Sequence, residues 1–207
     1  MDTKQVIKAL KISDIKISDI VIGTKKTNKK VPISLANKPL IYQTPYLEVV
    51  GGLKKTSYPN IYQLHTWLRG DTKKRIELYC KFIEDLESRI SDHIAQHGAK
   101  WFTNENILIK SFVKESETDN KSFYIIWMID LTSNIFVDEN RKPFVASNLK
   151  DKDHVKMIVE MSELQIHENQ CGISNRVQKI MVKPYVEKIE NEYVFDSESD
   201  GAPYDLD

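Results

Sequence analysis

The chain has 207 residues and carries 30 Lys and Arg against 30 Asp and Glu, so its formal net charge at pH 7 is zero. Hydrophobic residues make up 41% and charged residues 29%, as in an ordinary globular protein, and no apolar run reaches the roughly 18 residues that cross a bilayer. Two cysteines, Cys80 and Cys171, are too few for a disulfide scaffold or a cysteine-based zinc site and indicate a reducing, intracellular setting.

The zero net charge hides a gradient along the chain. Residues 1–60 contain 11 basic and 4 acidic residues, residues 61–186 contain 18 of each, and residues 187–207 contain 1 basic and 8 acidic residues. The net charge is therefore +7 at the start and −7 at the end. This asymmetry indicates either a polyanionic partner or charge pairing within the chain, although two merely solvated ends would give the same pattern.

The charge gradient and the local texture divide the chain into three parts. Residues 1–30 are a predicted basic N-terminal flank that ends in GTKKTNKK, a stretch with four lysines and almost nothing to bury. Strand-forming residues begin at Val31, and residues 31–186 are the predicted folded domain. Residues 187–207 are the predicted acidic C-terminal tail.

Strands are predicted on the N-terminal side of the domain. The stretch PLIYQTPYLEVVGGL at 39–53 contains strand formers interrupted by Pro45, with a turn expected at Gly51-Gly52. The next stretch, IYQLHTWLRG at 61–70, alternates between two faces. The predicted core face holds Tyr62, Leu64, Thr66 and Leu68, and the opposite face holds Gln63, His65, Trp67 and Arg69.

A long amphipathic helix is predicted over about residues 72–97. Apolar residues from Ile76 to Ile94 recur at steps of three and four, Asp71 is the expected N-cap, and Gly98 follows the expected end. Further strands are predicted at 106–114, 122–131, 155–166 and 172–182, the last two joined by a turn at HENQCG. The stretch 122–131 is apolar on both faces, which predicts a central strand.

This order of elements predicts an α+β fold that is mainly antiparallel β. A closed or partly closed, OB-like barrel carrying one long helix fits it, because closure removes the edges that short strands would otherwise expose.

Catalytic motifs are not found in the sequence. No glycine-rich phosphate loop and no G-x-S-x-G elbow occurs. His93 and His97 lie four residues apart on the predicted helix and could form half of a metal site, with a third ligand from His65, His154 or His167; the other interpretation is an ordinary helix rim. Cys80 is more simply a buried thiol than a nucleophile. We therefore predict no enzyme activity, no cofactor and no metal.

Aromatic side chains interleaved with cations are the most informative pattern. Unpaired bases stack on aromatic rings and phosphates bind cations, so a single-stranded nucleic-acid binder needs both. Filling of the second face of a sheet by these aromatic residues is the competing interpretation. The first candidates for nucleic-acid binding are Trp67, Arg69, Lys110, Phe112 and Lys114, and further candidates are Tyr42, Tyr46, Lys54, Lys55 and Tyr58. Trp127 is expected in the core.

The layout over about residues 35–185 resembles the OB-fold single-stranded-DNA-binding proteins of nucleocytoplasmic large DNA viruses, including the poxvirus type and the bacteriophage T7 type. The resemblance rests on the 39–53 stretch, the long helix that ends in Trp101-Phe102, and the closing hairpin MIVEMSELQIHENQCGISNRVQKIMVKP. Within that hairpin the matching residues are Gly172 and the run from Gln178 to Val182.

The resemblance implies binding of single-stranded DNA during viral replication, repair or recombination, at a replication site in the host cytoplasm or nucleus. In such a binder, the opposite charges of the two chain ends lead to a hypothesis for the tail: it competes with DNA for the cationic groove or recruits replication proteins, through Asp196, Glu198, Asp200, Asp205 and Asp207. A tail that only keeps the protein soluble is the other interpretation. A homo-oligomer is compatible with the resemblance, and no membrane is expected as a partner. Two other hypotheses stay open: a structural or protein-interaction module, which includes a virion component, and a small metal-dependent nuclease.

Overall fold

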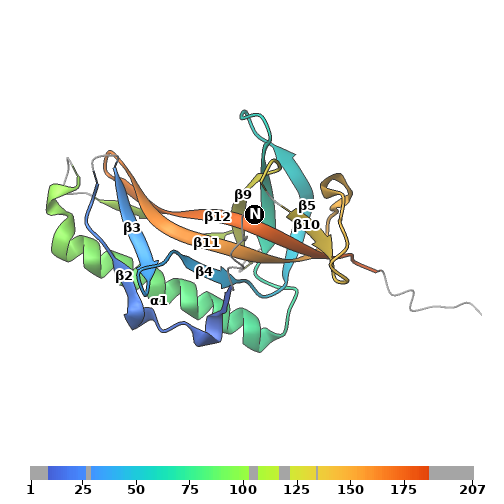
Figure 1. Ribbon diagram of the computed structural model, residues 1–207, viewed down its shortest axis with the longest axis horizontal. Coiled ribbons are helices and arrows are strands. Elements are labelled where there is room, and N and C mark those ends of the chain that lie inside the picture. Colours follow the sequence, from blue (N-terminus) through green and yellow to red (C-terminus); the bar gives the residue numbers. More distant parts are fainter. Residues whose placement is uncertain (1–8, 27–28, 103–106, 117–121, 134, 187–207) are drawn as a thin grey trace, which may run out of the picture.

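The computed structural model describes residues 9–26, 29–102, 107–116, 122–133 and 135–186 (Figure 1). The protein has the predicted α+β fold, with a mostly antiparallel sheet and one long helix, α1 (Lys73–His97). Within these ranges, no helix combines the length and the apolar character that crossing a membrane requires.

The strands lie on both sides of α1 in the chain. Those before the helix are β1 (Leu10–Lys11), β2 (Ile20–Ile22), β3 (Lys30–Leu35), β4 (Leu40–Gln43), β5 (Leu47–Lys55) and β6 (Ile61–Trp67). Those after it are β7 (Leu108–Lys110), β8 (Lys114–Glu115), β9 (Phe123–Asp130), β10 (Ile135–Asp138), β11 (His154–His167) and β12 (Gln170–Lys183). Short 3-10 turns lie at Ile12–Asp14, Ile17–Asp19, Gly98–Lys100 and Ala146–Asn148. β10 lies outside the strands that the sequence predicts, and it pairs in parallel with β12.

Five strands form an OB-like barrel. Antiparallel pairing joins β5 to β6, β6 to β9, β11 to β5 and β11 to β12. The ring closes where β9 lies beside β12. The ring order β5–β6–β9–β12–β11 is that of a partly open, five-stranded Greek-key barrel. The β11–β12 hairpin spans the molecule in Figure 1, and its turn falls in the predicted HENQCG stretch.

Gly51 and Gly52 form a bulge within β5, so the predicted turn at this point is wrong. The register between β5 and β6 shifts between Val50 and Leu53, and both glycines have positive φ values, 69° and 75°. A side chain on Gly52 would meet the Leu149 carbonyl oxygen at 2.7 Å. The glycines therefore bend a continuous strand, because only glycine combines this backbone with this contact.

Helix α1 closes one side of the barrel with the predicted apolar stripe. Its buried residues follow steps of three and four and are Tyr79, Phe82, Ile83, Leu86, Ile90 and Ile94. The N-cap is Thr72, one residue later than predicted. Asp71 instead accepts hydrogen bonds from the Thr72 and Tyr46 N–H groups, at 2.7 and 3.1 Å, and so joins the helix start to the strand region.

The described part of the N-terminal flank packs on α1. Ile15, Ile20 and Ile22 are buried in the same core as the barrel residues. Arg89 on the helix donates to the Ile20 and Ser18 carbonyl oxygens, at 2.9 and 3.2 Å. Residues of this flank therefore contribute to the folded unit, together with the predicted domain.

Candidate nucleic-acid interface

The outer surface of β6 and β9 gathers one set of alternating side chains. In register, Trp67 lies opposite Tyr124, His65 opposite Ile126, and Gln63 opposite Met128. Directly paired residues point to the same side of a sheet, so these six side chains share one surface, here named the β6–β9 face. The alternate residues Leu64, Thr66, Ile125, Trp127 and Ile129 are buried in the core. This confirms the predicted faces of β6 and the core position of Trp127.

Only part of the prediction for β9 agrees with the structure. The strand is central, because it pairs with β6 and β8. Its second face is not covered, however: Tyr124 and Ile126 are half-buried and Met128 is 45% exposed. An apolar run can thus lie in the core on one side and on an accessible surface on the other.

Three rings form the centre of the β6–β9 face. The His65 and Tyr124 rings are stacked, with centroids 6.0 Å apart and planes at 20°. The Trp67 and Tyr124 rings meet edge to face, at 5.8 Å and 80°. All three residues are half-buried, so the rings are held by neighbours yet keep surface that a flat ligand can contact.

Cations flank these rings on two neighbouring strands. Lys54 of β5 lies opposite Gln63, and Lys114 of β8 lies opposite Tyr124; both lysines are exposed. The pKa of His65 is lowered from its usual 6.5, first by burial and then by repulsion from Lys54 and Lys114. The His65 ring is therefore neutral at pH 7, and both lysines act electrostatically on the same small surface.

Arg69 lies over the ring of Trp67, with its guanidinium carbon 5.3 Å from the ring centroid. Its Nε and Nη2 both donate to Oε1 of Glu48, at 3.0 and 2.8 Å. Glu48 is the β5 residue directly opposite Trp67. Two predicted residues, Trp67 and Arg69, are thus adjacent, and a carboxylate already binds the cation.

The sequence predicts that Phe112 lies between Lys110 and Lys114 on one strand face, but the structure places its ring elsewhere. The predicted strand 106–114 is broken into β7 and β8, because Glu87 of α1 accepts hydrogen bonds from the Phe112 N–H at 2.6 Å and the Ser111 hydroxyl at 3.1 Å. The break turns the Phe112 ring onto Trp127, edge to face at 5.1 Å. Phe112 packs against the core, whereas Lys114 alone reaches the β6–β9 face.

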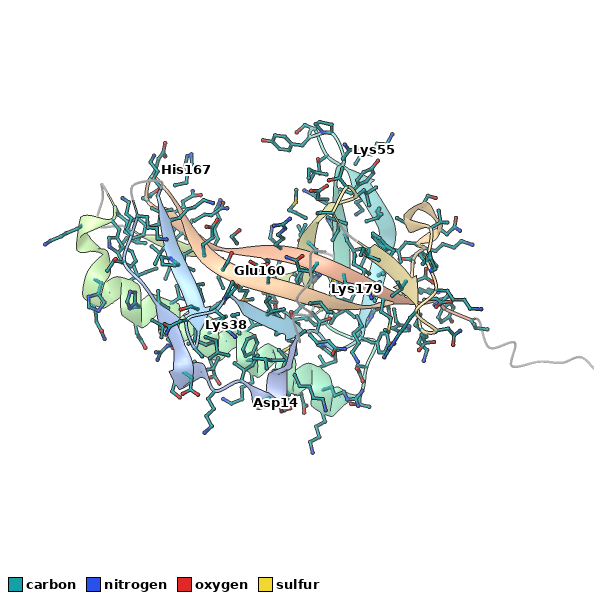
Figure 2. The ribbon with its side chains drawn as sticks, viewed as in Figure 1. Asp14, Lys38, Lys55, Glu160, His167 and Lys179 are labelled. Carbon is teal, nitrogen blue, oxygen red and sulfur yellow. The ribbon has the colours of Figure 1, made fainter. Side chains whose placement is uncertain are left out.

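The remaining predicted residues lie at separate places. Lys110, on β7, is opposite Gly172 of β12. Lys55 lies at the end of the β5–β6 hairpin, far from the β11–β12 tip at His167 (Figure 2). Tyr58, in the turn of the same hairpin, is 68% exposed.

Tyr42 cannot bind a base, in contrast to the prediction. Its side chain is fully buried, with its hydroxyl 3.5 Å from that of Tyr79, and burial raises its pKa far above the usual 10. Tyr46 lies on another surface, between Lys156 and Lys183, whose ammonium groups are 5.1 and 5.9 Å from its ring centroid. Tyr42 and Tyr46, on either side of Pro45, therefore lie in different environments, although their sequence surroundings are similar.

The histidine pair on α1 has a structural role. The His93 and His97 rings are 4.6 Å apart, and Nε2 of His93 forms a hydrogen bond with the Gly23 carbonyl oxygen at 3.1 Å. Across the described residues, no group of three His, Cys, Asp or Glu side chains could hold a metal ion. Burial raises the pKa of the Cys80 thiol, which argues against a nucleophile there.

The sequence did not identify Tyr124, Ile126, Met128 or His65 as candidate nucleic-acid-binding residues. The signal was present in the alternation of FYIIWMID, but its second face was assigned to the core. The register of β9 against β6 was needed to place it beside Trp67. The predicted tail residues Asp196, Glu198, Asp200, Asp205 and Asp207 lie outside the described residues.

The chain is similar to an uncharacterized protein of Acanthamoeba polyphaga mimivirus, with 40% identity over 181 residues. That match covers 87% of this chain and 56% of the relative, so the chain spans about half the length of the curated relative it matches. No protein-family model matches the chain.

Solved structures of two phage proteins are also similar to the chain. For the single-stranded DNA-binding protein of bacteriophage Enc34, the TM-score is 0.49 at 13% identity, covering 86% of this chain and 97% of that one. The same phage protein in complex with single-stranded DNA gives a TM-score of 0.48. The single-stranded DNA-binding protein of bacteriophage T7 gives 0.39 at 10% identity, covering 73% of this chain and 96% of that one.

Proposed function

We propose that this protein binds single-stranded DNA across the β6–β9 face, with little preference for base sequence. One observation carries the proposal: His65, Trp67 and Tyr124 form a partly accessible ring cluster with an exposed lysine on each side, Lys54 and Lys114. In OB barrels, the surface of the second and third strands is the usual place for an oligonucleotide. In the ring order of this barrel, those strands are β6 and β9.

The chemistry of this face suits unpaired bases. Every base has a flat π-surface, so stacking on Trp67 and Tyr124 needs no hydrogen-bond code and tolerates any sequence. Lys54, Lys114 and Arg69 supply positive charge for the phosphates that lie between stacked bases. A duplex hides its base faces, so the rings offer nothing to it. The arrangement therefore favours single strands.

The proposed role in the cell is protection of single strands during viral DNA replication, repair or recombination. A viral setting is supported by the similarity to a mimivirus protein. The acidic tail, with its net charge of −7, would compete with DNA for the cationic face and recruit replication proteins when DNA displaces it. A tethered competitor acts at high effective concentration even when its intrinsic affinity is weak.

A titration with fluorescently labelled oligo-dT at two salt concentrations tests the proposal. Binding should weaken steeply with salt, because phosphate contacts release counterions. Trp67→Ala should cost about 1–3 kcal/mol without changing the salt dependence, because a stacking contact has no charge. Substituting Lys54 or Lys114 by Ala should reduce the slope of log K against log salt by about 0.7 each.

Tyr185→Ala is the matched control, since Tyr185 is 46% exposed and lies outside the β6–β9 face. It should bind oligo-dT like the unchanged protein. Equal losses in the two variants, or no measurable binding at low salt, would refute the proposal.

A protein-interaction module is the second candidate function. The exposed apolar side chains of Met128 and Phe123, at 45% and 47%, favour it, because exposed apolar surface marks many protein contacts. The same titration decides between the two, since a module of this kind would leave oligo-dT free. Incubation of labelled DNA with magnesium tests the nuclease hypothesis.

A further inference from the structure

A second surface of the barrel carries cations and an aromatic ring, and it is separate from the β6–β9 face. It is the outer surface of β11 and β12 around Tyr46, Arg141, Lys156, Ile158, Lys179 and Met181, named here the β11–β12 face. The alternate residues of these strands, including Met157 and Ile180, are buried. The cationic side chains therefore point away from the core.

Register places the residues of this face in rows across the sheet. Lys11 of β1 pairs with Gln43 of β4, which pairs with Ile158 of β11, which pairs with Lys179 of β12. Neighbouring strands lie about 4.8 Å apart, so Lys11 and Lys179 end a row of about 14 Å. Lys156 lies opposite Met181 in the next row. Three cations are thus spread over the face at separate points.

The surface is hollowed between these cations. One hollow is lined by Gln43, Ile158 and Met181, together with Lys156, Lys179 and Arg141. A neighbouring hollow shares Gln43 and Lys156 and adds Lys11. In the part of the chain that the structure describes, ion pairs hold Lys183 to Glu139 and Arg75 to Asp71 nearby, but no carboxylate lies within 4.0 Å of the Lys11, Lys156, Lys179 or Arg141 nitrogens.

Tyr46 gives the face its aromatic component. Its half-buried ring lies between the ammonium groups of Lys156 and Lys183, and its hydroxyl donates to Glu139 at 3.4 Å. Burial, followed by the negative charge of Glu139, raises the pKa of this phenol. The ring therefore stays neutral and fixed, with cations close to it, as in the ring cluster of the β6–β9 face.

Arg176 connects the two faces. It is exposed on β12, opposite Glu160, three residues before Lys179. It also lies close enough to Asp130, at the end of β9, to help lower the pKa of that carboxyl group after its hydrogen bonds to Thr132. Because β9 lies beside β12 where the barrel closes, Arg176 lies between the end of β9 and Lys179, with Asp130 and Glu160 as neighbouring carboxylates. Figure 2 shows Glu160 and Lys179 on the middle part of the β11–β12 hairpin, away from its tip at His167.

We propose that the β11–β12 face binds a second segment of the same single strand, beyond the segment on the β6–β9 face. This inference rests on the proposed function. Two features favour a phosphate backbone as the occupant. Arg176 lies between the two faces, and the other cations are spaced separately along the rows of the sheet. An acidic peptide, including the protein's own tail, has the same charge, and the experiment must separate it from DNA.

The full-length variant Lys156→Ala/Lys179→Ala tests this path with dT oligomers of two lengths. A short oligomer covers the β6–β9 face only and should bind as it does to the unchanged protein. An oligomer several times longer should bind more weakly, and the slope of log K against log salt should fall by about 1.4, because two phosphate contacts are lost. Lys81→Ala/Lys100→Ala removes the same charge from α1 and the turn after it and serves as the control.

Each outcome decides the inference. Loss for the long oligomer alone supports it. Unchanged binding at both lengths overturns it, and so does an equal loss at both lengths that the control variant reproduces. A gain in affinity, which disappears when the five tail acids are changed to their amides, would assign the face to the tail and overturn the DNA path. Failure of the proposed function itself would appear differently, as no effect of Trp67→Ala on the short oligomer.

Discussion

Arg69 has two partners in the structure, the Trp67 ring and the Glu48 carboxylate. The ion pair is on the surface, with the Arg69 side chain 54% exposed, so its own contribution to stability is small. Its larger effect concerns ligand binding, because the carboxylate occupies the guanidinium that a phosphate would use. In the proposed function, Glu48 therefore competes with a phosphate for Arg69.

Glu48→Gln should tighten oligo-dT binding by up to about 1 kcal/mol, because it removes the charge that holds Arg69. The salt slope should also steepen by about 0.7, as one more cation becomes available to phosphate. The titration described above measures both quantities. Glu77→Gln, on α1 and paired with Lys73, makes the same charge change elsewhere. Similar tightening in both variants would show a general charge effect and contradict the role of Glu48.

If DNA binds the β6–β9 face as proposed, His65 should make the affinity depend on pH. Its pKa lies below 6.5 in the free protein, and a phosphate close to Lys54 and Lys114 would favour the protonated ring and raise that pKa. Affinity should therefore rise as the pH falls toward the pKa of the free protein and level off below that pKa. His65→Gln should flatten this dependence between pH 7.5 and about 5.5. An unchanged pH profile in the variant would exclude His65 from the interface.

The same shift has the opposite effect on the free protein's stability. The unfolded chain takes up a proton at His65 near pH 6.5, before the folded protein does. Any contribution of the neutral ring to the free energy of unfolding is complete above that pH and is lost as the pH falls toward the folded pKa. Acid should thus strengthen the proposed DNA binding at His65 and weaken the free fold.

At the scale of elements, α1 covers one side of the barrel, and the strands carry the proposed binding surface. The helix buries one apolar stripe against the core, and through Glu87 it fixes the break between β7 and β8. That break places Lys114 on β8, opposite Tyr124. The helix therefore supports the β6–β9 face from behind without forming part of it.

Leu86→Ala should lower the free energy of unfolding by about 2–5 kcal/mol, because Leu86 is fully buried and the change leaves a cavity. Leu78→Ala, on the same helix at a residue that is 44% exposed, should cost much less. Urea denaturation of both variants measures the difference. Without urea, the oligo-dT affinity of both variants should be unchanged. A loss of affinity in folded Leu86→Ala alone would indicate that α1 takes part in binding and does not only support the β6–β9 face.

At the scale of the whole molecule, the sequence places opposite net charges near the two ends of the chain, +7 over residues 1–60 and −7 over residues 187–207. The described chain leaves β12 at Lys183, beside Tyr46 and Glu139, and the acidic segment follows directly. A segment of about 20 residues can span up to roughly 70 Å when fully extended. The proposed competition of the tail with DNA therefore has a direct test.

Changing Asp196, Glu198, Asp200, Asp205 and Asp207 to their amides in the full chain should tighten oligo-dT binding at low salt. The gain should shrink as salt increases, because screening weakens the competition between solvated charges. Affinity measured at about 50 mM and 300 mM salt tests both parts, and a scrambled tail of the same composition is the control. Equal affinity of the neutral and acidic tails at low salt would refute self-competition and leave partner recruitment as the tail's proposed role.

The local periodicities of the sequence determined the elements of this protein. Steps of three and four fix α1 to within a residue or two, and the alternation of IYQLHTW puts Trp67 and His65 on the face opposite Leu64. These patterns depend on neighbours within one element, and one sequence contains all of that information. The α+β class and the closing hairpin follow from the same signals.

The tertiary structure decided which aromatic residues are accessible. Tyr42 and Tyr46 have similar sequence surroundings, yet α1 covers the first and lysines of β11 and β12 flank the second. Phe112 was lost from the predicted site because Glu87 bends its segment toward Trp127. Tyr124 joined the site because the register sets it opposite Trp67. Burial and cross-strand pairing depend on residues distant in the chain, and local periodicity carries no information about which of them meet.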